Sequence, residues 1–288
     1  MDIKDLGHIY PEIVSRHTRI DLVIDRRLKV KFTTADITLW VTQYIWPFIR
    51  IAAFVGVVPI FGTRNVPARV KIILAFALAI MVVPILPKFQ AGDPLSLAGM
   101  LITLQQLLIG ILLGFIVSIV FSALIIGGQS VAQLMGLGFA SMMDPQNGVS
   151  VPVVGQFYTV LATIIFLIMN GHLILVNTLV GSFKTMPIGG HILLNDKFWQ
   201  VVLWSKWMFI AALVIALPAI TALLLVNVAF GVMTRASPQL NIFAVGFPIT
   251  ILLGFIAMLV SLPYFVPKIQ DIFDQTLHFM RHGLVGIS

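Results

Sequence analysis

The stretch GMLITLQQLLIGILLGFIVSIVFSALIIGGQSVAQLM (residues 99–135) is apolar along its whole length and contains no charged residue. About 20 apolar residues are enough to cross a hydrocarbon core that is about 30 Å thick. At about 1.5 Å per residue, a helix over this segment would be roughly 55 Å long. We therefore expect a helix that extends beyond the bilayer core and packs there against other protein.

Small residues recur at four-residue intervals along this segment and shortly after it, with one slip between Ser122 and Gly128. Residues four apart share one helix face, and small side chains let neighbouring helices approach closely in lipid. Packing within the chain would satisfy any one pair, whereas a row of this length predicts contact with partner helices. The row, which we call the small-residue ridge, consists of Gly110, Gly114, Ser118, Ser122, Gly128, Ala132, Gly136 and Ala140.

The composition of the whole chain indicates an integral membrane protein. Of the 288 residues, 59% are hydrophobic and only 10% are charged, and the mean hydropathy is +1.04. Soluble domains usually carry about 25% charged residues. The net charge of +7 suits contact with anionic lipid headgroups, and the absence of cysteine excludes disulfides and thiolate chemistry.

About six apolar segments follow one another, which predicts an all-α membrane protein. The third and fifth are too long for one straight crossing, and Pro218 is expected to kink the fifth. We therefore expect long kinked helical hairpins that pack with partner subunits. The segments are Ile37–Phe61, Ile72–Leu86, Gly99–Met135, Val153–Val180, Val201–Met233 and Ile242–Val266.

Charge is concentrated at the beginning of the chain, where residues 1–35 hold twelve of the twenty-nine charged side chains. Residues 1–33 are expected to be a charged leader, either flexible or lying on the membrane. The loop at residues 63–71 and the basic C-terminal tail both favour the cytoplasm. Positively charged loops tend to lie in the cytoplasm. Six full crossings would place both termini on one side of the membrane and the loop on the other, so the leader, the loop and the tail cannot all be cytoplasmic. The topology of the termini stays open.

The segment GLGFASMMDPQNGVSVP (residues 136–152) follows the long apolar stretch. Its glycines permit tight or left-handed backbone, Phe139, Met142 and Met143 offer adaptable apolar surface, and Asp144-Pro145 would end a helix. Irregular backbone at membrane depth must be buried in protein or line a cavity. The residues are compatible with a loop that closes a pore and equally with a plain connector that has a hydrophobic foot.

Four stretches of the sequence carry a resemblance to one family. They are residues 136–157 (GLGFASMMDPQNGVSVPVVGQF), 164–189 (IIFLIMNGHLILVNTLVGSFKTMPIG), 44–72 (YIWPFIRIAAFVGVVPIFGTRNVPARVKI) and 234–254 (TRASPQLNIFAVGFPITILLG). Together they resemble the FliR/SctT family of type III secretion export gates. The resemblance covers about residues 34–270, and residues 1–33 have no counterpart in it.

The resemblance implies a subunit of the flagellar protein export gate, in the bacterial inner membrane at the flagellar basal body. The implied partners are FliP and FliQ, with FlhB attached to the same core, and unfolded flagellar proteins would pass through the shared channel. Residues 34–190 would be FliP-like, and residues 191–288 would be a FliQ-like helical hairpin. The plug of the channel would be Gly136, Leu137, Gly138, Phe139, Ala140, Ser141, Met142, Met143, Asp144 and Pro145.

Two alternatives stay open beside the flagellar interpretation. An injectisome export-gate subunit would share the same family features. A small-molecule permease would instead be expected to show internal repeats, with broken helices at matching positions, and Pro218 is the main such feature in this sequence.

Several polar residues within or beside the apolar segments need partners. Arg50 and Arg235 are predicted to contact a partner subunit or a helix terminus, since a buried cation in an apolar setting requires a partner; snorkelling to the interface is the alternative. Gln239 and Asn241 would bond across an interface or cap the last helix. His172 has no His or carboxylate three or four residues later, so a packing role is favoured over a metal site.

Catalytic motifs are missing from the sequence. It contains no paired carboxylates within one apolar region, no glycine-rich phosphate loop of the P-loop kind and no HExxH motif. The sequence therefore predicts a protein without enzymatic activity, cofactor or metal site.

Overall fold

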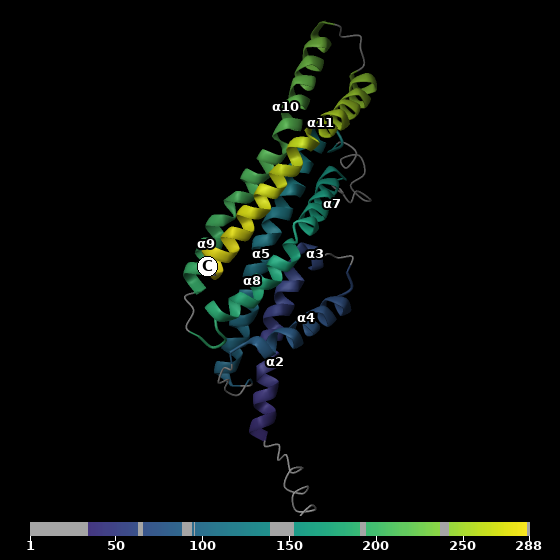
Figure 1. The fold of residues 1–288 in the computed structure, drawn as a ribbon. Coiled ribbons are helices and arrows are strands. Elements are labelled where there is room, and N and C mark those ends of the chain that lie inside the picture. The colour runs from purple at the N-terminus through teal and green to yellow at the C-terminus, as the bar shows by residue number, and fades with distance from the viewer. Residues whose placement is uncertain are drawn as a thin grey trace, which may run out of the picture. The chain divides into compact units, whose positions relative to one another are not determined.

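The computed structural model describes residues 34–62, 66–87, 94, 96–138, 153–190, 194–236 and 242–286 (Figure 1). The regular structure of these residues is helical, without strands, which confirms the predicted all-α fold. The backbone contacts divide the chain into residues 1–42 and 43–288, and the contacts below belong to the second unit. The main helices are α2 (Thr34–Val57), α3 (Pro59–Gly62), α4 (Ala68–Val82), α5 (Leu97–Leu134), α7 (Val153–Ile168), α8 (Gly171–Thr185), α9 (Leu194–Trp204), α10 (Lys206–Ala236) and α11 (Ile242–His278).

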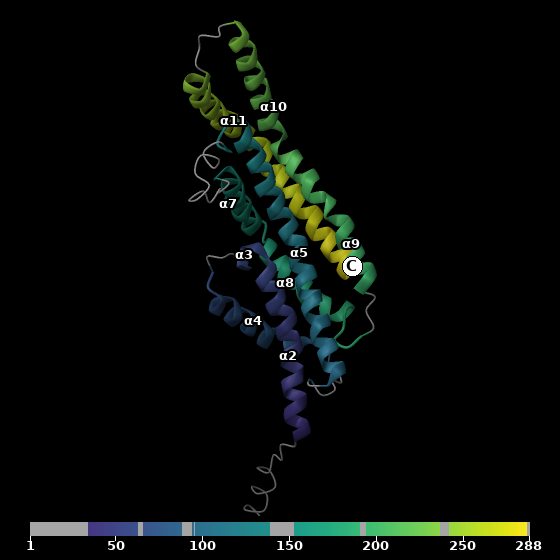
Figure 2. The same cartoon turned by 180° about the vertical axis from the view of Figure 1, so that it is seen from behind.

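Helix α5 lies at the centre of the second unit, as one uninterrupted helix of 38 residues. Its N-cap is Ser96, whose side chain accepts a hydrogen bond from the backbone N–H of Gly99 at 3.1 Å. Helices α7 and α10 both pack along it, and α11 packs on α10 and runs antiparallel to it (Figure 1). Figure 2 shows the same arrangement from behind. The central position of α5 explains why so many of its side chains are buried.

Four helical segments are long and apolar enough to cross a membrane, and the bent pair α7–α8 would be a fifth. These candidate spans include α5, the α9–α10 region and α11. Large apolar side chains are exposed on several of them, for example Leu213 on α10 and Val260 on α11. Exposed apolar surface on this scale requires lipid or further protein around it.

The fourth predicted apolar segment contains two helices. Helix α7 ends at Ile168, α8 begins at Gly171, and the two axes differ by 70°. The break is at Asn170, whose φ of 55° lies in the left-handed region. Asparagine is one of the few residues that adopt this conformation at low cost, and it is followed here by glycine. The Asn-Gly pair thus turns the chain inside an apolar run.

Two other helices differ from the apolar segments that predicted them. Helix α10 runs from Lys206 to Ala236 with Pro218 inside it, and the predicted kink at Pro218 stays a prediction. Helix α11 continues beyond the predicted end at Val266 as far as His278. Its last turns contain charged residues but still bury Ile269, Phe273 and Leu277. Spacings of about four residues place these three side chains on one face, so packing extends the helix after the continuous apolar run has ended.

Candidate gate junction and buried arginine site

Arg50 lies on α2 and is fully buried, with 0% of its surface exposed. Its Nε donates a hydrogen bond to Oε1 of Gln106 on α5 at 2.8 Å. Its Nη1 donates to Oγ of Ser182 on α8 at 3.1 Å, and Nη2 donates to the carbonyl oxygen of Met186 at 2.8 Å. The fork of the guanidinium, with its fixed N–H directions, therefore ties three segments together.

The positive charge of Arg50 is stabilised by neutral groups. The guanidinium carbon lies 4.1 Å from the centre of the Phe183 ring, within the range of a cation–π contact. Met186 is the C-cap of α8, so its carbonyl belongs to the partially negative end of that helix. Among the described residues no carboxylate forms an ion pair with Arg50. We call Arg50, Gln106, Ser182, Phe183 and Met186 the arginine cluster.

Further polar contacts surround the arginine cluster on the same part of α5. The indole N–H of Trp46 donates to Oγ1 of Thr103 at 3.1 Å. The side-chain amide of Gln105 donates to the carbonyl of Gly190 at 3.0 Å, in the segment that follows α8. The first half of α5 is thus held to α2 and to the end of α8 by side-chain hydrogen bonds as well as by packing.

The first half of the small-residue ridge faces α2. A Cβ atom at Gly110 would collide with the backbone of Arg50, and one at Gly114 would lie 2.9 Å from Cβ of Val57. Oγ of Ser118 donates to the carbonyl of Val57 at 2.9 Å. These positions let α2 and α5 approach to backbone distance.

The second half of the ridge faces α7. A Cβ at Gly128 would lie 2.5 Å from both Cα and N of Gly155. Ala132 is buried and Ser122 is half-buried. The ridge therefore packs on helices of its own chain at Gly110, Gly114, Ser118 and Gly128. Its contact with partner helices stays a prediction.

Helix α5 ends in a glycine cap at the start of the predicted plug. Gly136 has a φ of +82°, and its N–H donates to the carbonyl of Gln133 at 3.0 Å. The N–H of Leu137 donates to the carbonyl of Ala132 at 3.0 Å. This pair of hydrogen bonds is the Schellman motif, which requires a left-handed residue and turns the chain away from the helix axis.

Two contacts from other helices hold this end of α5. The ring of Phe247 on α11 lies close to Gly136. A Cβ atom on this glycine would be 2.6 Å from Cε2 of the ring. The amide of Asn227 on α10 donates to the carbonyl of Leu134 at 3.2 Å, which satisfies one of the free carbonyls of the last turn. We call residues 134–138 the gate junction.

The remaining predicted site residues are divided between exposed and undescribed positions. Arg235 is exposed in the last turn of α10, where a cation is favourable. Gln239, Asn241 and Ala140 lie outside the described residues, as do the plug residues Phe139, Ser141, Met142, Met143, Asp144 and Pro145. Their predicted roles stay predictions.

No group of three or more His, Asp or Glu side chains is placed to hold a metal ion in the described part of the chain. Nδ1 of His172 is buried there without a hydrogen-bond partner. His172 follows Asn170 and Gly171 at the bend between α7 and α8.

Four members of the arginine cluster were not predicted from the sequence. Gln106, Ser182, Phe183 and Met186 were not singled out, although they provide every described contact of the Arg50 guanidinium. One signal was available, because Gln105 and Gln106 are adjacent polar residues inside a long apolar run. Polar groups in such a run are expected to face other protein.

The sequence of the chain matches a known protein family. The family described as "Bacterial export proteins, family 1" matches residues 41–276. The chain belongs to this family. It is 36% identical over 257 residues to a protein of Pectobacterium carotovorum named "Flagellar biosynthetic protein FliR", across 89% of this chain and 98% of that protein.

Two more relatives have the same name. The protein from Escherichia coli is 37% identical, across 84% of this chain and 92% of its own length. The protein from Bacillus subtilis is 34% identical, across 85% of this chain and 96% of its own length. The bacterial export family thus confirms the predicted FliR resemblance over nearly the whole chain.

Proposed function

We propose that this chain is the FliR-type subunit of the flagellar type III protein export gate. The observation that carries the proposal is its likeness to a flagellar biosynthetic protein, which it matches over 98% of that protein's length. The fold agrees, since four or five candidate spans make it a membrane protein. The chain would have a structural and channel-forming role without catalysis.

The proposed gate is formed by the chain that leaves the gate junction. Residues 136–152 would close the channel, with Phe139, Met142 and Met143 as its apolar seal. The Schellman motif at Gly136 supports this proposal because it stops α5 and redirects the backbone at the first residue of the predicted plug.

The proposed partners are FliP and FliQ, with FlhB attached to the same core in the inner membrane at the basal body. Residues 34–190 would act as the FliP-like part and residues 191–288 as the FliQ-like hairpin. Exposed apolar side chains on both parts support this arrangement, for example Phe115 on α5, Leu225 on α10 and Leu252 on α11. Such side chains need protein or lipid against them.

Complementation tests the function as a whole. The full chain is expressed in a flagellated bacterium that lacks its own FliR, and swimming in soft agar is scored together with secretion of hook and filament proteins. The proposal predicts that both return. Normal expression in the membrane with neither swimming nor secretion would reject the flagellar assignment, and rescue of an injectisome strain alone would favour that system instead.

A deletion tests the plug separately. The chain without residues 139–145 is purified with its partners and placed in a planar bilayer. The plug proposal predicts a complex of normal composition whose ion conductance rises clearly above that of the intact complex. Background conductance in a complex of normal composition would show that these residues do not seal the channel, and would leave the family assignment untouched.

A further inference from the structure

Aromatic rings fix the second half of α11. The ring centroid of Phe265 lies 4.7 Å from that of Tyr158 on α7, and the centroid of Phe273 lies 4.9 Å from that of Phe166 on the same helix. Both phenylalanines are buried. Aromatic pairs at these distances attract each other beyond the gain from burial alone, so this half of α11 is anchored on α7.

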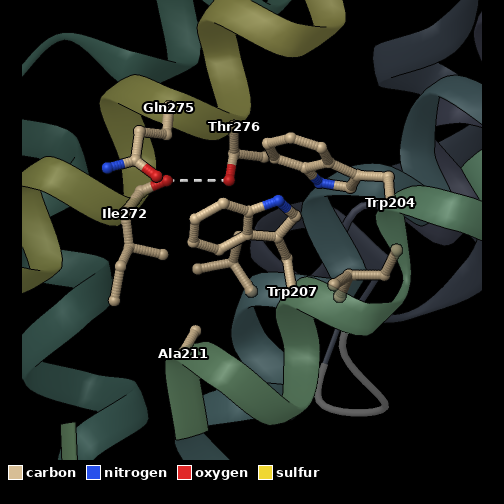
Figure 3. A pocket seen from close by; sticks show the side chains of 8 residues that line it. Trp204, Trp207, Ala211, Ile272, Gln275 and Thr276 are labelled. Atoms are coloured by element: carbon tan, nitrogen blue, oxygen red, sulfur yellow. Dashed lines mark hydrogen bonds between the residues drawn. The ribbon is translucent and has the colours of Figure 1, made fainter. Parts of the chain in front are cut away.

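The end of α11 is anchored by aromatic contacts as well. The indole ring of Trp204 stacks on the ring of Phe279, which directly follows α11, with 4.1 Å between the ring centroids. Figure 3 shows Trp204 and Trp207 beside Thr276 of α11. The junction of α9 and α10 is thus packed on the last turns of α11.

The first half of α11 has a different environment. Residues 246–262, which we call the α11 arm, carry large exposed apolar side chains such as Leu259 and Val260. An open apolar groove of about 890 Å³ lies between the arm and α7, and its lining includes Phe157 of α7 and Phe255 of the arm. The arm therefore lacks the close packing on α7 that holds the second half of the helix.

The α11 arm meets the end of α5 at Phe247 and Gly254. The ring of Phe247 lies against Gly136. A Cβ atom on Gly254 would overlap the side chain of Met135, which is fully buried and is the C-cap of α5. The arm therefore covers the point at which the chain leaves α5 toward the predicted plug.

Prolines mark the boundary between the α11 arm and the anchored half of the helix. Pro263 and Pro267 lie inside α11, and each lacks the N–H that would bond to the carbonyl four residues earlier. Helices bend most readily where such a bond is missing. The arm can therefore change its angle near Pro263 while the aromatic contacts of Phe265 and Phe273 stay in place.

We propose that the α11 arm holds the gate junction in the closed conformation of the channel, with Phe247 as the positioning residue of this contact. While Phe247 lies against Gly136, the chain leaves α5 in the direction that the Schellman motif sets. Movement of the arm away from α5 would release Gly136 and let the plug leave the channel. Because the exposed apolar side chains of the arm need protein against them, a partner subunit packed there would set its position.

The first experiment measures how well the channel is closed. It compares Phe247→Ala with the matched control Phe255→Ala, which removes the same ring from a position in the groove and outside the gate junction. Each full chain is purified with its partners, and ion conductance is recorded in a planar bilayer. Phe247→Ala should raise the conductance about tenfold, since loss of one aromatic contact shifts a two-state equilibrium by roughly that factor. Phe255→Ala should leave it unchanged.

The second experiment locks the arm onto α5. The chain contains no cysteine, so Met135→Cys together with Gly254→Cys introduces a single pair. The overlap of a Gly254 Cβ with the Met135 side chain brings the two Cβ atoms within reach of a disulfide. In a flagellated strain that lacks its own FliR, secretion of hook protein should stop after oxidation and return after reduction. Met135→Cys with Gly254→Ser cannot form the bond and should secrete equally before and after oxidation.

Two results would overturn the proposal. The first is equal conductance of the Phe247→Ala and Phe255→Ala complexes, and the second is undiminished secretion by chains in which peptide mass spectrometry detects the disulfide. If Phe247→Ala does not accumulate, Phe247→Leu takes its place in the same comparison. The inference rests on the proposed export function, and failure of the wild-type chain to restore secretion would reject that function instead.

Discussion

The two ends of α5 are held in different ways. Near its beginning, Gln106 belongs to a cluster in which a buried arginine on α2 is hydrogen-bonded to α5 and to the end of α8. At its end, the gate junction is held by a backbone cap, by the side-chain amide of Asn227 and by apolar contact with Phe247. Directional bonds specify one arrangement, whereas apolar contacts tolerate small displacements.

This difference suits a channel subunit with one fixed part and one movable part. Releasing the Arg50 guanidinium from its partners would leave several buried polar groups unsatisfied, at a cost that grows with each group. At the gate junction the described side-chain hydrogen bond between helices is the one from Asn227 to the carbonyl of Leu134. If the proposed plug beyond Gly136 moves, we expect the first half of α5 to stay in place.

The first prediction tests whether the arginine cluster is the fixed part. Arg50→Ala leaves the Gln106 and Ser182 side chains without their shared donor and removes buried volume. The free energy of unfolding should fall by about 2–4 kcal/mol, measured by SDS titration of the purified chain. Arg69→Ala, at an exposed position on α4, should change it by less than about 0.5 kcal/mol. Equal losses of unfolding free energy in the two variants would show that the arginine cluster does not fix this part of α5.

The second prediction concerns the packing that holds the second half of α5. In Gly128→Ala the new methyl group meets the backbone of Gly155 at 2.5 Å, and backbone cannot move aside as a flexible side chain can. The substitution should destabilise the chain by about 1–3 kcal/mol. Gly231→Ala, in a helix with nothing within 4 Å, should instead stabilise it by up to about 1 kcal/mol. Thermal unfolding in detergent compares them, and a stabilised Gly128→Ala chain would show that α5 and α7 are not in backbone contact.

The sequence predicted the helical class, the long third helix and the row of small residues, because each follows from a regular pattern along one helix. The break at Asn170 was missed because the apolar pattern continues on both sides of it, although the Asn-Gly pair was visible. The partners of Arg50 were missed for a different reason. Ser182 and Met186 are more than 130 residues away in sequence, and no local spacing connects them to α2.

The third prediction sharpens the description of the gate junction. At Gly136 the φ of +82° disfavours any side chain, so Gly136→Ala should cost about 1–2 kcal/mol. Gly138→Ala is the control, since its nearest neighbour would be 3.8 Å from the new Cβ and no left-handed φ is involved. In the assembled complex, Gly136→Ala should also raise ion conductance, because the chain that enters the plug is redirected. If both variants had the same melting temperature and the same conductance, the Schellman motif at Gly136 would not control how the chain enters the plug.

The smallest effect is expected at the bend between α7 and α8, which contact different halves of α5. Helix α7 packs on the second half of α5, while the end of α8 holds Arg50, and Asn170 sets the 70° angle between them. Asn170→Gly keeps the left-handed φ accessible and should change the stability by less than about 0.5 kcal/mol, whereas Asn170→Ala should lose about 1 kcal/mol. Thermal unfolding of the two variants measures the difference. If alanine is tolerated as well as glycine, the bend does not depend on the conformation of residue 170, and the fixed and movable parts of α5 are coupled through packing alone.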